Sequence, residues 1–93
     1  MTTNKDLKEQ IVTVGISQGD IDNAKGKCPI WTWFEQAFPQ FKVKVLRSSV
    51  QILPQTGNKG LYGKFPYEAI TFTHAFDFGL KCNPVCFNVD LRI

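Results

Sequence analysis

The stretch "CPIWTWFEQAFPQFKVKV", residues 28–45, passes from the hydrophobic period of a helix to that of a strand. Pro29 and Pro39 bound its first part, because proline suits the first position of a helix and cannot continue one. This part predicts an amphipathic helix that supplies the core, with Trp31 at its rim as a packing or a contact residue. The apolar residues that recur on its core face are Ile30, Phe34, Ala37 and Phe38.

The end of the stretch alternates apolar residues with Lys42 and Lys44. Strict alternation predicts a strand with one buried and one solvated face. Residues 50–52 are expected to return as its hairpin partner. A β-branched run after the polar start predicts a strand at residues 11–14, and alternation of apolar and polar residues predicts another at residues 85–91.

Two further helices have recognisable ends. Ser17 followed by Asp20 has the pattern of a capping box at the start of a short helix. Pro66 suits the start of a longer helix, which Gly79 is expected to end as a left-handed cap. The residues of this longer helix that are expected in the core are Ala69, Phe72, Thr73 and Phe76.

These elements predict one small α+β domain. The expected architecture is an antiparallel sheet of about four strands with two main helices packed on one face, because the helical and strand faces can only be buried against each other. A chain of 93 residues supports a single core. We expect a flexible N-terminal tail over residues 1–10 and the α+β domain over residues 11–93.

The stretch "PQTGNKGLYGK", residues 54–64, is predicted to form a mobile loop or a loose hairpin tip, since its three glycines lie three residues apart. It differs from a phosphate-binding loop in its spacing and in having Phe65 where a Mg²⁺-binding hydroxyl is needed. We interpret it as an interaction loop that presents Tyr62 to a partner.

Composition argues against several classes of protein. The chain is 43% hydrophobic and 20% charged, as is typical of soluble globular proteins, and no apolar run is long enough to cross a bilayer. The polar start lacks the apolar region of a signal peptide, and three cysteines are an odd number for a secreted disulfide framework. We therefore expect a cytoplasmic protein with no membrane partner.

Residues with metal-binding or catalytic chemistry are scattered along the chain. They do not form the two close pairs typical of zinc sites, and no nucleophile motif accompanies the single histidine. We therefore expect a protein that is not an enzyme and uses no metal or cofactor. The residues given structural roles on this interpretation are Cys28, His74, Cys82 and Cys86.

Lysines accompany the aromatic residues that are expected at the surface. Lysine for phosphate and aromatic rings for bases is the combination that single-strand binders use. A net charge of +3 is small for a nucleic-acid binder, and lysine also protects exposed strands from aggregation. The candidate binding residues are Trp31, Lys42, Lys44, Lys59, Tyr62 and Lys64.

Two stretches, residues 11–34 and 67–91, resemble a family of short uncharacterised proteins found in bacteriophages and in some bacteria. The shared features are a Cys-Pro-apolar helix start and a late helix that ends in Phe-Asp-x-Gly before a proline-containing approach to the last strand. The chain departs from the family pattern in residues 57–63. The matching residues are Ile21, Gly26, Cys28, Pro29 and Ile30, then Phe76, Asp77, Gly79, Pro84 and Phe87.

The resemblance implies a phage setting, in which small proteins without catalytic motifs often act by binding. We therefore expect a non-catalytic accessory protein that binds a host protein, as an inhibitor of a bacterial defence system of the anti-CRISPR kind does. A weak, basic single-stranded nucleic-acid-binding module is the alternative. The sequence leaves the identity of the partner and the oligomeric state open.

Overall fold

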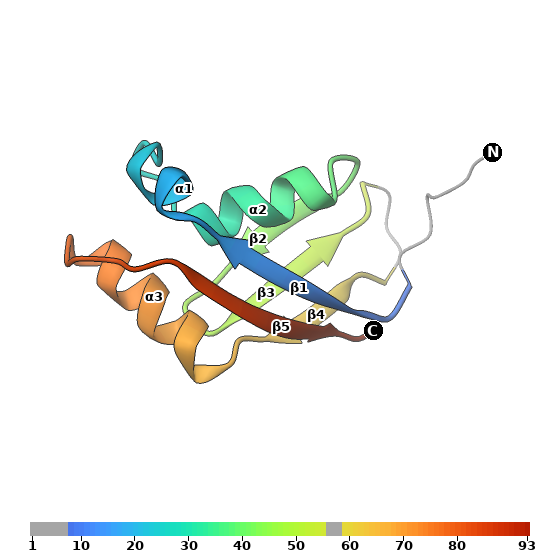
Figure 1. Cartoon of the computed structure of the whole chain (residues 1–93). Coiled ribbons are helices and arrows are strands. Elements are labelled where there is room, and N and C mark those ends of the chain that lie inside the picture. The colour runs from blue at the N-terminus through green and yellow to red at the C-terminus, as the bar shows by residue number, and fades with distance from the viewer. Residues whose placement is uncertain (1–7, 56–58) are drawn as a thin grey trace.

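The computed structural model describes residues 8–55 and 59–93, and within them it contains five strands and three helices (Figure 1). The predicted α+β class is confirmed, with five antiparallel strands in two sheets. In chain order the elements are β1 (Gln10–Ile16), α1 (Gln18–Asp22), α2 (Pro29–Ala37), β2 (Lys42–Val45), β3 (Ser49–Leu53), β4 (Leu61–Lys64), α3 (Tyr67–Asp77) and β5 (Val85–Leu91).

The two sheets are joined by one pair of residues. β2, β3 and β4 form an antiparallel sheet in chain order, while β1 pairs with β5 along its whole length. The Tyr62 amide donates to the Arg92 carbonyl at 2.6 Å, and the Arg92 amide donates back to the Tyr62 carbonyl at 2.9 Å. The strands therefore follow one another in space as β1-β5-β4-β3-β2.

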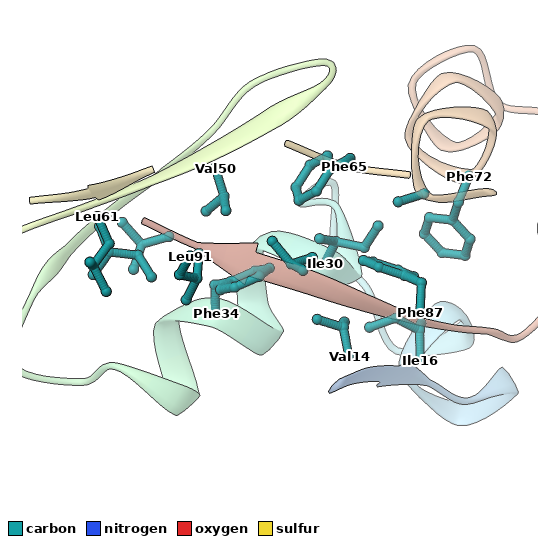
Figure 2. Packing of buried hydrophobic residues seen from close by; sticks show 14 of the residues in the cluster. Val14, Ile16, Ile30, Phe34, Val50, Leu61, Phe65, Phe72, Phe87 and Leu91 are labelled. Carbon is teal, nitrogen blue, oxygen red and sulfur yellow. The ribbon is translucent and has the colours of Figure 1, made fainter. Parts of the chain in front are cut away.

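α2 closes the side that this strand order leaves open. The helix packs against β1 and β2, the first and last strands of the order. Figure 1 shows α2 along the upper side of the strands, with β1 and β5 crossing in front of the other three. Ile30 and Phe34 of α2 are fully buried and point into the cluster of Figure 2, together with Val14, Val50 and Leu91. The core thus lies between the two sheets and α2.

α3 packs against β5 and is fixed to the turn between β2 and β3. Ala69, Phe72 and Thr73 are its buried residues. The Thr73 hydroxyl donates to the Ile70 carbonyl at 2.9 Å and lies 3.3 Å from the Arg47 carbonyl. Phe76, which the sequence placed on the same core face, is half-buried at the edge of the cluster.

The predicted helix ends are confirmed. α2 begins at Pro29, and Gly79 adopts the left-handed conformation with a φ of 69° just beyond α3. Ser17 and Asp20 form the capping box of α1. The Asp20 amide donates to the Ser17 hydroxyl at 3.1 Å, and the Ser17 amide donates to the Asp20 carboxylate at 2.8 Å.

The prediction of a loop over residues 54–64 is wrong for its last four residues. Leu61–Lys64 form β4, in which Leu61 and Gly63 are buried while Tyr62 and Lys64 are exposed. A Cβ atom at position 63 would lie 2.6 Å from Val89 Cγ1, so glycine here allows close strand packing and not a mobile turn. Residues 56–58 of the predicted loop lie outside the described residues.

The expected tail over residues 1–10 falls mostly outside the described residues. β1 already begins at Gln10, which pairs with Leu91 of β5. Glu9 accepts a hydrogen bond from the Ile93 amide at 2.9 Å. The paired part of the domain therefore starts before residue 11, the boundary expected from the sequence.

Candidate binding face of the three-stranded sheet

Alternation along β2, β3 and β4 gives their sheet one buried and one solvated face. On β2, Val43 is buried while Lys42 and Lys44 are exposed. Residues that pair directly across antiparallel strands project to the same side of a sheet. We call the solvated side the basic sheet face and define it by Lys42, Lys44, Gln51, Tyr62, Lys64 and Arg92.

Four of these residues form a row across the strands. Lys44 of β2 pairs with Gln51 of β3, and Gln51 pairs with Tyr62 of β4. Tyr62 in turn pairs with Arg92, directly after β5. The row therefore has a cation at each end and an exposed aromatic ring between them.

The backbone pairing brings Gln51 close to the ring. Tyr62 directs both its amide and its carbonyl to Arg92. Its pairing with Gln51 is therefore of the non-hydrogen-bonded kind, in which the Cα atoms lie about 4.5 Å apart and the side chains are nearest. Gln51 is half-buried. The two backbone hydrogen bonds between Tyr62 and Arg92 hold the Tyr62 backbone in place on its β5 side.

Arg92 is held by its neighbour on β5. Its Nε donates to one Asp90 oxygen at 2.9 Å and its Nη2 donates to the other at 3.1 Å. These bonds and the negative charge of Asp90 raise the pKa of Arg92 above its ordinary value. Two of the five guanidinium N–H donors are used in this way, so the others remain for a ligand.

Charge is unevenly distributed between the sheet and the helices. Lys42, Lys44 and Lys64 are exposed on the sheet, and the acidic residues near Arg92 are Asp90, which forms an ion pair with it, and Glu9. A chain with a small net charge of +3 thereby gathers three of its lysines on one sheet face. Most acidic side chains of the described residues lie on the helices: Asp20, Asp22, Glu35, Glu68 and Asp77.

The structure brings together four of the six candidate residues predicted from the sequence, namely Lys42, Lys44, Tyr62 and Lys64. Lys59 is exposed just before β4, where no strand pair fixes its direction.

Trp31, the sixth candidate, does not join the basic sheet face. It lies on α2 and lines a pocket with Val45, a residue that alternates with the exposed Lys44 and so belongs to the other side of β2. The Lys27 ammonium lies 5.2 Å from the centre of its ring. Its Nε1 is buried and has no hydrogen-bond partner among the residues that the structure describes. Trp31 is therefore mainly a packing residue.

Sequence reasoning missed Gln51 and Arg92 as parts of the face. The predicted hairpin gives a weak indication for Gln51. With the register of the structure, Gln51 lies opposite Lys44 and therefore on the same face. Arg92 continues the alternation of β5. Its position beside Tyr62 depends on pairing between β4 and the end of β5, which no local pattern indicates.

The potential catalytic groups do not converge on one site. Cys28 lines a pocket of about 370 Å³ between α2, the β2–β3 turn and α3. Burial raises the pKa of its thiol, which keeps the thiol protonated and weakly nucleophilic near neutral pH. The His74 ring packs against Phe78, with 4.6 Å between the ring centres and an angle of 38° between the ring planes. Within residues 8–55 and 59–93, no three metal-ligating side chains lie close enough to hold an ion.

Comparison with known proteins adds no relative. No protein family, no curated protein and no solved structure matches the chain. In the described part of the chain, none of the helices has both the length and the apolar character required to span a bilayer.

Proposed function

We propose that the protein is a non-catalytic binding protein and that its basic sheet face binds single-stranded nucleic acid. The observation that supports this proposal is the row Lys44-Gln51-Tyr62-Arg92, which places an exposed ring between two cations on the basic sheet face. Cations that follow a backbone and rings that stack on bases are the two requirements of single-strand binding.

The phosphate contacts would come from lysines at the sides of the row as well as from its ends. Lys42 precedes Lys44 by two residues on β2, and Lys64 follows Tyr62 by two residues on β4. Each lysine offers a mobile point charge that suits a flexible backbone better than it suits one fixed partner. Binding of this kind is weak and is expected to depend strongly on salt.

A host protein is the other candidate partner, because the resemblance to phage proteins implies one. An acidic protein surface, such as that of a bacterial defence component, would meet the same cations. The geometry favours nucleic acid over this partner, since the residues around Tyr62 on the described face are mostly polar, and the apolar Leu53 opposite Lys42 is half-buried. Protein interfaces more often surround their anchors with an apolar core. In either case we place the activity in the cytoplasm, the compartment expected from the composition.

Salt dependence of binding tests the proposal. Fluorescence anisotropy of labelled oligothymidylate and oligouridylate would be measured at about 50 mM and about 200 mM salt. About three phosphate contacts give a slope near −2 in the double-logarithmic plot, so affinity should fall about twenty-fold between the two conditions. The double variant Lys42→Ala/Lys44→Ala should bind more weakly and show a slope that is smaller by about 1.4.

The matched control removes the same charge elsewhere. Lys25 lies beside the pocket between α1 and α2, and Lys81 follows α3, so Lys25→Ala/Lys81→Ala should retain the affinity and the slope. Equal losses in both double variants would mean attraction by net charge alone and would contradict a defined face. The protein partner would be favoured if neither oligonucleotide binds at low salt and the protein captures a host protein in a complex that persists at about 200 mM salt.

A further inference from the structure

We infer that the bound strand crosses β2, β3, β4 and the end of β5 instead of running along them, and that one base stacks on Tyr62. This inference rests on the function proposed above and adds the path and the length of the ligand. It follows from the positions of the cations relative to the ring.

The direction follows from where the charges lie. Moving from Tyr62 across the strands, a ligand meets Arg92 on one side, and Gln51 and then Lys44 on the other. Moving along β4, it meets Lys64 in one direction and the uncharged Gly60 in the other. The exposed Lys59 lies beyond Gly60, but no strand pair fixes its direction, so the path across the strands is the one on which paired residues place a cation on both sides of the ring.

The length follows from the spacing of strands. Neighbouring strands lie about 4.8 Å apart, so the path from Lys44 to Arg92 covers three spacings, or about 14 Å. A stacked single strand advances about 3.4 Å per nucleotide, and an unstacked strand advances further. The row therefore accommodates roughly two to four nucleotides.

Tyr62 is suited to be the stacking platform. It is 43% exposed, while its backbone is held by two hydrogen bonds to Arg92. Gln51 lies beside it with an amide that can both donate to and accept from a base edge. With one ring and one amide the face can hold a base without reading a sequence, so the ligand is a short single-stranded segment of any base composition.

A length series tests the path. Anisotropy would be measured with oligothymidylates from about two to about ten nucleotides at low salt. Affinity should rise steeply up to about four nucleotides and then increase only in proportion to the number of overlapping registers. A steep rise that continues to ten nucleotides would overturn the crossing path, while the proposed function would stand.

Substitution at position 62 tests the stacking. Tyr62→Leu, which keeps an apolar residue on β4, should weaken binding of a four-nucleotide ligand about five- to one hundred-fold, whereas Tyr62→Phe should bind as the parent does. Tyr67→Leu is the matched control, because Tyr67 is 81% exposed but lies on α3. Circular dichroism would confirm that each variant is folded.

An abasic ligand distinguishes stacking from a general loss of contact. Replacing the interior bases with abasic sites should weaken binding to the parent by about the same factor as Tyr62→Leu, and should have little further effect on that variant. If Tyr62→Leu binds like the parent while Lys42→Ala/Lys44→Ala loses affinity, the stacking inference is overturned and the binding function remains. If no oligonucleotide binds the parent protein, both fail.

Discussion

At the scale of single residues, Gly63 decides how closely the two sheets meet. A Cβ atom at this position would lie 2.6 Å from Val89 Cγ1 and 2.9 Å from Leu91 Cδ2. Both neighbours are buried in a densely packed core and cannot move aside freely. β4 approaches β5 because position 63 carries no side chain.

Gly63→Ala should therefore lower the free energy of unfolding by about 1–3 kcal/mol. Gly15→Ala on β1 is the control, since a Cβ atom there has nothing within 4 Å and its φ is not positive. That control should change the stability little or raise it by about 0.5 kcal/mol. Urea unfolding measures the free energy of unfolding of both variants. Equal stability of Gly63→Ala and Gly15→Ala would show that β4 and β5 do not require the absence of a side chain at position 63.

At the scale of elements, Phe34 is the largest side chain that α2 buries completely in the core. This side chain is fully buried, and its ring centre lies 5.0 Å from that of Trp33 and 6.3 Å from that of Phe65. Phe34→Ala should cost about 3–5 kcal/mol, a large part of the stability of a small domain. Phe76→Ala on α3 should cost less because Phe76 is only half-buried. Thermal melts that place Phe34→Ala at or above Phe76→Ala would contradict this ranking.

The start of α1 should respond to acid. Hydrogen bonds from the Ser17 backbone and side chain lower the pKa of Asp20 below its ordinary value of 3.8. A carboxylate with a lowered pKa stabilises the fold above its unfolded pKa, and this contribution is lost as the pH falls through the folded value. The amides of α1 should therefore shift, and lose protection from exchange relative to an unstructured chain at the same pH, as the pH falls below 3.8, as NMR would show. In Asp20→Asn the same signals should lose this pH dependence, and a parent protein whose α1 amides do not respond to acid would lack the capping box in solution.

Helix starts and single-sided strands could be predicted from the sequence because their signals are local. Pro29 begins α2, Ser17 caps α1 and Lys42 alternates with Val43, each as a short pattern indicates. β4 was missed because glycine was taken as a turn residue, although "LYGK" alternates buried and exposed positions. Local propensity cannot reveal that Gly63 is needed for close approach to β5, since the neighbours that demand it lie far along the chain.

At the scale of the whole molecule, the binding face depends on long-range pairing. Four of its six defining residues, Lys42, Lys44, Tyr62 and Lys64, are predicted as candidates from the sequence, but the sequence does not show that they share one side of the sheet. Their convergence requires the register of three strands and the link between Tyr62 and Arg92. Tryptophan is a common contact residue, but Trp31 packs on the other side of β2. Its position follows from the packing of α2 against β2, which the sequence does not show.

The pairing of β1 with β5 also has a consequence during synthesis on the ribosome. β1 pairs along its length with a strand that is translated after every other element, with Gln10 opposite Leu91. Until β5 emerges from the exit tunnel, β1 has no partner strand in the nascent chain. Its apolar face is formed by Val12, Val14 and Ile16. The domain therefore completes its fold only after translation of β5, and chaperones that recognise short apolar segments would find β1 accessible until then.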